Sequence, residues 1–203
     1  DDAISNDNIS HIYFHDNNTV YLSTLGGGLI KVRVELEEKY KVFKVSETMS
    51  ESMGLGSDYV YASITDENSN LFIATDGGGL QLFENGKFRS LIKENKLKSN
   101  TVFSLCRDKY NNIWGTTNAD GIIKYDGKKL TSFNLGNGLR DLHPQQLIAV
   151  EEILYAINSK GIDKINCKTN EVTYYDVFES DMEPNLNALF YHQNKLYSGT
   201  NKG

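Results

Sequence analysis

The sequence predicts an all-β fold built from repeated four-stranded antiparallel sheets, and three observations support this prediction. A short pattern of an aromatic residue, a threonine and a glycine recurs along the 203 residues. The apolar strand-like segments are separated by turns rich in Asn, Asp and Gly, which adopt turn conformations that most residues avoid. No amphipathic helical segment of about ten residues separates the strands, so the pattern excludes a parallel α/β fold.

The repeat sets the period of the chain. Five copies begin at aromatic residues and read "YLSTLGGGLIKV", "FIATDGGGLQLF", "WGTTNADGIIKY", "YAINSKGIDKI" and "YSGTNKG". Their last glycines are Gly28, Gly79, Gly121, Gly161 and Gly203, at intervals of 51, 42, 40 and 42 residues. The first interval is longer because residues 32–55 carry an insertion. A period of about 42 residues is typical of one blade of a β-propeller.

Each repeat has room for four strands joined by hairpins. A strand and an Asp/Asn-rich turn precede each aromatic residue, and a third strand, a tight turn and a fourth strand follow the glycine. The tight turns are expected at Asn85-Gly86 and Asp126-Gly127, since both dipeptides favour two-residue hairpins. The fourth strands carry Phe43, Phe88, Phe133, and Tyr174 or Tyr175. We therefore expect blades at 5–55, 57–97, 99–139 and 141–181, and a half blade at 184–203.

Four and a half blades fall near the lower limit for a closed propeller ring. An open fragment leaves unpaired strand edges at both ends. The half blade supplies only its first two strands, and the chain begins at a first strand with no spare strand to close it. The sequence therefore predicts a piece of a larger propeller, typically one with seven blades.

Composition excludes several classes of function. The net charge is -6 and the pI is about 5.2, so we expect this segment to bind no nucleic acid. No signal peptide and no apolar run long enough to span a bilayer is visible. Cys106 and Cys167 are interpreted as isolated thiols, because they lack the spacing of metal ligands. No metal or cofactor is expected; His11 and His15 share a strand face but have no third ligand.

The third copy, "SNTVFSLCRDKYNNIWGTTNADGIIKYD", resembles the two-component regulator propeller repeat. The first two copies are similar to it in "VYLSTLGGGL" and "LFIATDGGGL", whereas the fourth has Asn158 in place of Thr and keeps only Gly161. The resemblance implies the periplasmic, or extracytoplasmic, part of an inner-membrane receptor of a bacterial hybrid two-component system. It also implies an oligosaccharide ligand, a histidine kinase elsewhere in the full-length protein, and a homodimer as one expected assembly.

The triple glycines could instead bind a phosphate, but that function requires a helix N-terminus directly behind them. A strand-like segment follows Gly79, so we interpret the glycines as turns that supply positive φ angles. The repeated aromatics Tyr21, Phe72, Trp114, Tyr155 and Tyr197 are interpreted as packing between blades rather than as a sugar-stacking platform. No local nucleophile signature is present, so we expect no catalytic residue.

Ligand candidates come from the loops that gather at one end of a propeller. The loops between second and third strands, and those leading into each first strand, carry polar groups that suit sugar hydroxyls. Solvated loops are polar in any case. The main candidates are Asp76, Asn118, Asp120, Arg140, His143 and Asn158. The same loops also offer Asn6, Asp58, Asn100, Asp141 and Lys160.

The sequence leaves three functions open. The first is a non-enzymatic sensor that binds an oligosaccharide. The second is a propeller glycan lyase or hydrolase, which would need an acid and a base converging from several blades. The third is a protein–protein interaction scaffold. The sequence does not specify the ligand.

Overall fold

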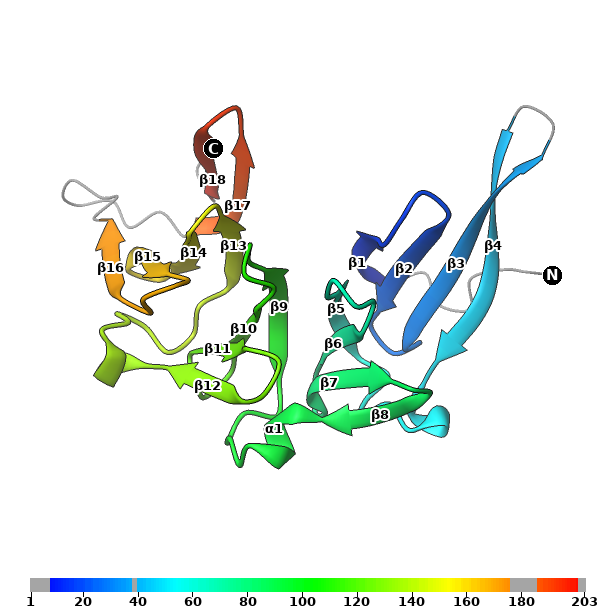
Figure 1. Ribbon diagram of the computed structural model, residues 1–203, viewed down its shortest axis with the longest axis horizontal. Helices are drawn as coiled ribbons and strands as arrows, with labels where there is room; N and C mark the ends of the chain where they lie inside the picture. Colours follow the sequence, from blue (N-terminus) through cyan, green and yellow to red (C-terminus); the bar gives the residue numbers. More distant parts are fainter. Residues whose placement is uncertain (1–7, 38–39, 176–185, 201–203) are drawn as a thin grey trace. The chain divides into compact units, whose positions relative to one another are not determined.

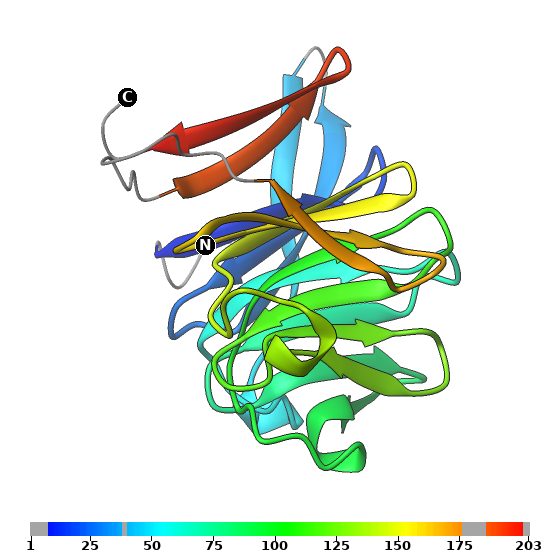
Figure 2. The same cartoon turned by 90° about the vertical axis from the view of Figure 1, so that its left-hand side faces the viewer.

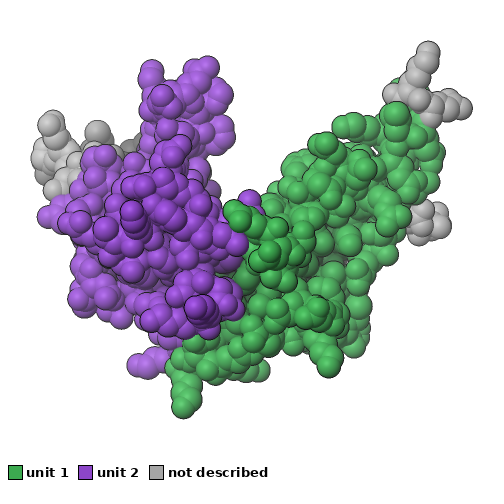
Figure 3. Space-filling view, in the orientation of Figure 1, with its two compact units in different colours: residues 1–96, 100–102 green, residues 97–99, 103–203 purple. Residues whose placement is uncertain are grey.

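The computed structural model describes residues 8–37, 40–175 and 186–200. Within them the chain forms four four-stranded antiparallel sheets and one two-stranded sheet, each built from consecutive strands (Figure 1). The predicted all-β fold class is confirmed. The chain divides into two compact units, residues 1–96 with 100–102 and residues 97–99 with 103–203 (Figure 3).

Unit 1 contains the first two sheets. The first sheet consists of β1 (Ile9–Phe14), β2 (Thr19–Thr24), β3 (Leu29–Glu37) and β4 (Tyr40–Met49). The second consists of β5 (Val60–Thr65), β6 (Leu71–Thr75), β7 (Gly79–Glu84) and β8 (Lys87–Ser90). A 3-10 helix (Glu51–Met53) precedes β5, and α1 (Leu91–Glu94) follows β8. The predicted insertion is accommodated by the lengths of β3 and β4, which have nine and ten residues.

Unit 2 contains the other three sheets. The third sheet consists of β9 (Val102–Arg107), β10 (Ile113–Thr117), β11 (Ile122–Tyr125) and β12 (Leu130–Phe133). A 3-10 helix (Leu135–Asn137) leads to the fourth sheet, β13 (Gln146–Val150), β14 (Ile153–Asn158), β15 (Gly161–Asn166) and β16 (Val172–Tyr175). The hairpin of β17 (Leu186–His192) and β18 (Lys195–Thr200) follows, and β17 lies beside β13 and β14 (Figure 2).

Both predicted hairpin turns are present, but only one of them has two residues. Asn85 and Gly86 both have positive φ angles, 52° and 74°, as a two-residue hairpin requires. At the other turn only Gly127 has a positive φ, and the loop between β11 and β12 spans four residues. The carboxylate of Asp126 causes this, because its Oδ1 atom accepts hydrogen bonds from the backbone N–H groups of Lys128 and Lys129. An Asp side chain that bonds ahead to the backbone favours a longer turn.

The repeated threonine and glycine are joined by a hydrogen bond. The hydroxyl of the threonine donates to the carbonyl of the glycine four residues later, at 2.8 Å in Thr24–Gly28, 3.0 Å in Thr75–Gly79 and 2.9 Å in Thr117–Gly121. Each bond closes the turn between a second and a third strand. No helix follows these glycines, so their interpretation as turns is confirmed.

Glycine is required in these turns for two reasons. Gly121 has a φ of +74°, and a Cβ atom there would lie 2.2 Å from the carbonyl oxygen of Phe133 at the end of β12. The same pair of constraints holds at Gly28, whose Cβ would lie 2.2 Å from the carbonyl oxygen of Met49 at the end of β4. The turn therefore brings the start of the third strand against the end of the fourth. Gly203 lies outside the described residues.

Most of the repeated aromatic residues pack between sheets. Tyr21 of the first sheet shares a buried cluster with Leu71 of the second, and Trp114 of the third shares one with Leu147 of the fourth. Tyr155 packs against the cluster that contains Leu189 of β17. Phe72 is also buried, whereas Tyr197 in the final hairpin is 49% exposed. The packing interpretation is thus confirmed for the three residues whose clusters span two sheets.

Replacing Gly121 with Ala should destabilise the protein more than the same change at Gly127. Both glycines have positive φ, but nothing lies within 4 Å of a Cβ at Gly127. We expect Gly127→Ala to cost about 1–2 kcal/mol from backbone strain alone, and Gly121→Ala at least about 1 kcal/mol more, from displaced backbone. Urea denaturation of the two variants measures the difference. Equal losses would contradict the close approach of β12.

Candidate functional site

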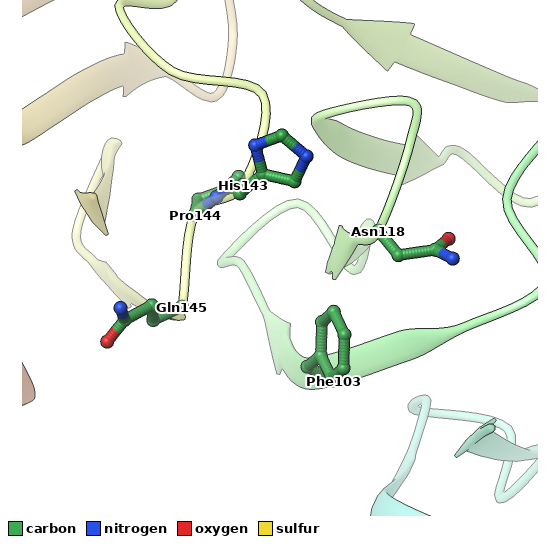
Figure 4. Close-up of a pocket in the computed structure, with 5 residues that line it drawn as sticks. All are labelled: Phe103, Asn118, His143, Pro144 and Gln145. Carbon is green, nitrogen blue, oxygen red and sulfur yellow. The ribbon is translucent and has the colours of Figure 1, made fainter. Parts of the chain in front are cut away.

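A cavity of about 380 Å³ lies in unit 2, between the third and fourth sheets (Figure 4). Phe103 comes from β9, Asn118 from the turn between β10 and β11, and His143, Pro144 and Gln145 from the segment that leads into β13. The volume is within the range of small-molecule sites. Two of the predicted candidates, Asn118 and His143, therefore line one cavity.

The lining combines apolar and polar surface. Phe103 is 38% exposed and offers a ring face, and Pro144 adds further apolar area to the lining. The amides of Asn118 and Gln145 each carry donors and an acceptor, and His143 adds a ring nitrogen. A ring with several hydroxyl groups needs such paired donors and acceptors around an apolar platform.

Asp141 holds the segment that carries His143. Its Oδ1 atom accepts the backbone N–H of His143 at 3.0 Å and lies 3.4 Å from the Nδ1 atom of that residue. Its Oδ2 atom accepts hydrogen bonds from the hydroxyl and the backbone N–H of Ser159. Burial alone would raise the pKa of Asp141, but the hydrogen bonds from Ser159 and His143 outweigh it and lower the pKa. The ionised carboxylate thus ties the cavity segment to the turn before β15.

Asp120 has a similar anchoring position on the other side of the cavity. Its Oδ2 atom accepts the backbone N–H groups of Lys98 and Ser99, at 2.9 and 2.7 Å. Its own backbone N–H donates to the hydroxyl of Thr117 at 2.9 Å. These bonds fix the turn that carries Asn118. The carboxylate of Asp120 therefore supports the cavity wall without lining it.

Arg140 and Asn158 meet at a buried carboxylate instead of at the cavity. The Nε atom of Arg140 donates to Oδ1 of Asp163 at 2.9 Å, and the amide of Asn158 donates to Oδ2 at 2.7 Å. The side chain of Asp163 is only 2% exposed. The Arg140 guanidinium also lies over the ring of Tyr174, 4.6 Å from its centroid. Both residues thus make internal contacts in the fourth sheet.

Asp76 belongs to unit 1, whereas every residue that lines the cavity belongs to unit 2. Its Oδ1 atom accepts the hydroxyl of Thr101 at 2.7 Å, and its backbone N–H donates to the carbonyl of Tyr59. Asn6, a secondary candidate, lies outside the described residues. All six main candidates remain predictions as ligand contacts.

Three lining residues, Phe103, Pro144 and Gln145, were not expected from the sequence. One signal for Phe103 was present: Tyr61 occupies the same place after the first valine of its strand, in "VYASIT" and "VFSLCR". A repeated aromatic at that place marks a residue on a first strand near a loop end. Pro144 and Gln145 carry no repeat signal.

The remaining polar chemistry of the described residues is sparse. No group of three or more His, Cys, Asp and Glu side chains that could hold a metal ion occurs among them. No helix in that part of the chain is long and apolar enough to cross a membrane. Both cysteines are free thiols, and Cys167 is buried.

Asp108 organises the environment of Cys167. This buried carboxylate accepts the indole N–H of Trp114 at 2.7 Å and the side-chain amide of Asn112 at 2.8 Å. Its Oδ1 atom accepts the backbone N–H groups of Tyr110 and Asn112. Burial, together with the nearby charge of Asp108, raises the pKa of Cys167 to about 12. The thiol is therefore protonated, and a poor nucleophile, at neutral pH.

Residues 96–119 match the family model described as "Two component regulator propeller". The chain carries a two-component regulator propeller repeat. This match includes the turn of Asp108 and the strand of Trp114, on which the resemblance in the sequence was based. No curated protein matches the sequence.

Solved structures show the fold to which this propeller repeat belongs. The extracellular domain described as that of the hybrid two component system BT3049 from B. thetaiotaomicron matches with a TM-score of 0.76 at 18% identity. The match covers 95% of this chain and 26% of that one. The corresponding domain of BT4673 from the same organism matches with a TM-score of 0.75 at 14% identity, with the same two coverages. The chain thus spans about a quarter of these two structures.

An enzyme shares the fold as well. A catalytically inactive virginiamycin B lyase from Staphylococcus aureus, solved with quinupristin, matches with a TM-score of 0.66 at 10% identity. That match covers 97% of this chain and 65% of the lyase chain. At this identity the similarity shows the fold alone, and fold alone does not specify function.

Arg140→Ala should destabilise the fold, because it leaves the buried Asp163 carboxylate without its cation. Removing one partner of a buried ion pair costs about 3–5 kcal/mol. Lys128→Ala is a suitable control, since Lys128 is exposed and donates to Asp126 through its backbone N–H. Urea denaturation should show a large loss for the first variant and almost none for the second. A small loss at Arg140 would show that the pair is dispensable.

Stability should fall as the pH rises above about 8.5, partly because of Cys167. A cysteine in the unfolded chain ionises near that pH, whereas the folded thiol keeps its proton until about pH 12. The unfolded state therefore loses a proton first, and stability declines between these two values. Cys167→Ala removes this contribution, so its urea midpoint should fall less steeply from pH 7 to pH 10. Parallel pH profiles would rule out the contribution.

Proposed function

We propose that the chain is part of the extracellular sensor propeller of a bacterial hybrid two-component receptor, and that the unit 2 cavity binds an oligosaccharide. The propeller repeat at residues 96–119 supports the first part. The two B. thetaiotaomicron structures, described as extracellular domains of such systems, support it further. The kinase of such a receptor would lie elsewhere in the full-length chain.

The lining of the cavity carries the second part of the proposal. Phe103 gives a ring on which the apolar face of a pyranose can stack, and Asn118 and Gln145 add amide donors and acceptors to the lining. Among the described residues, no Asp, Glu, Lys or Arg side chain lines the cavity. A neutral, polyhydroxylated ligand therefore fits it better than a highly charged one.

Ligand binding would shift the equilibrium between two arrangements of the dimeric receptor. The partners in this proposal are the remaining blades of the same chain and a second receptor molecule in a homodimer. The location of such a domain is extracytoplasmic, in the periplasm. These assignments rest on the family repeat and on the matched receptors.

Substitutions in the cavity should weaken oligosaccharide binding without a comparable loss of stability. We expect Phe103→Ala to lower affinity about ten-fold, because it removes the stacking surface. Gln145→Ala should lower it about two- to ten-fold, by the loss of one or two neutral hydrogen bonds. Gln193→Ala, in the exposed turn between β17 and β18, is the matched amide control.

The measurement is a thermal-shift screen of the natural protein against defined oligosaccharides, followed by calorimetry on the best one. Stabilisation by one sugar class, reduced in both cavity variants, supports the proposal. Unchanged affinity in Phe103→Ala would move the sugar site away from this cavity. Release of product from a polysaccharide would favour the alternative of a glycan lyase or hydrolase. Capture of a protein without any sugar response would favour a scaffold.

A further inference from the structure

A second cavity, of about 320 Å³, lies within unit 1 between the first and second sheets. The turn between β1 and β2 and the turn between β5 and β6 contribute to it, through Asp16 and Ser69. In a sheet of consecutive antiparallel strands, these turns lie at the opposite end from the glycine turns. The cavity is therefore separate from the loops on which the ligand candidates were predicted.

Three polar side chains cross the first sheet in one row and line this cavity. Tyr21 on β2 pairs directly with Lys31 on β3, which pairs directly with Glu47 on β4. Directly paired residues project from the same face of a sheet and lie about 5 Å apart at Cβ. This face packs on the second sheet, because Tyr21 and Leu71 share a buried cluster.

The polar groups in this row are not satisfied by the protein. Tyr21 is only 7% exposed, yet within the described residues its hydroxyl has no hydrogen bond, and Lys31 and Glu47 have no ion pair. Lys44, further along the same hairpin, shows the contrast: its ammonium lies 2.9 Å from Glu35 and 2.6 Å from Glu37. Lys31 and Glu47 are half-buried and the Tyr21 hydroxyl is not a fully buried atom, so all three groups can be reached by a ligand that enters the cavity.

The charges define what such a ligand must carry. Burial, followed by the charges of Glu47 and Asp16, raises the pKa of Tyr21, so both carboxylates act at the phenol. An anion such as phosphate would be repelled by these carboxylates, and a simple amine would be repelled by the ammonium of Lys31. A molecule with one positive and one negative group satisfies both sides of the row.

The cavity also has an apolar part, beside the polar side chains of His15, Thr19 and Ser69. Met49 from β4, Leu71 from β6 and Phe83 from β7 line it alongside the polar row. These side chains offer no hydrogen-bonding groups apart from the weak sulfur acceptor of Met49. They suit an aliphatic or aromatic group better than a ring of hydroxyls.

We propose that this cavity binds a small zwitterion with an apolar body, the chemistry of a free α-amino acid. The ligand ammonium lies by Glu47 and Asp16 and donates a hydrogen bond to the hydroxyl oxygen of Tyr21. The ligand carboxylate pairs with Lys31. The apolar side chain packs on Leu71 and Phe83. This inference is independent of the oligosaccharide proposal, since the two cavities belong to different units.

The test is calorimetry of the natural full-length chain with leucine and phenylalanine, their N-acetyl and amide derivatives, and glucose. Only the free amino acids should bind, because each derivative removes one charge. Lys31→Gln and Glu47→Gln should each weaken binding at least about ten-fold, by the loss of a charge-assisted hydrogen bond. Lys41→Gln, an exposed position on β4, is the matched control and should bind normally.

Hydrogen exchange with bound ligand locates the site. Protection of segments 13–21 and 40–49 by a free amino acid supports the proposal. Equal binding of the blocked derivatives, binding of glucose at these segments, or no amino-acid binding at all would overturn it. Protection of segments 103–118 and 143–145 by an amino acid would also overturn it, whereas protection there by a sugar bears only on the oligosaccharide proposal.

Discussion

The hydrogen bond from a threonine hydroxyl to the carbonyl of a glycine four residues later is the interaction on which the first three sheets depend. It closes the turn between the second and third strands, and in two of these sheets the glycine then abuts the carbonyl at the end of the fourth strand. One short turn therefore fixes three of four strands. The aromatic residue three positions before the threonine lies on the second strand. In the first and third sheets it packs against the next sheet.

The fold could be predicted because this turn leaves a local signature. A turn that needs a positive φ angle and has no room for a Cβ atom requires glycine. The spacing of these glycines along the sequence therefore predicts the spacing of the sheets. The hairpin at Asp126-Gly127 shows the limit of such local rules. The dipeptide is compatible with a two-residue turn, but the Asp126 carboxylate bonds forward to two backbone groups and extends the loop.

The site was harder to predict, for a different physical reason. The sequence shows which side chains are polar but not whether the fold already satisfies them. Asn118 and His143 reach a cavity, whereas Arg140 and Asn158 bond to Asp163, and Asp120 bonds to the backbone. Asp163 lies within a strand, outside any loop pattern. The row of Tyr21, Lys31 and Glu47 was equally hidden, because its members are brought together by strand register.

The fourth sheet reaches the same geometry by another chemistry. Asn158 stands where the other copies have threonine, and its amide and the Arg140 guanidinium both bind Asp163, next to the glycine of that turn. The hydrogen bond between a threonine hydroxyl and a glycine carbonyl is replaced here by contacts among Asn158, Asp163 and Arg140. The order of the four strands is the same as in the other sheets. The interactions that close this turn can thus differ in one repeat while they are kept in its neighbours. That independence gives a tandem array freedom to diversify one binding surface while its other members continue to hold the architecture.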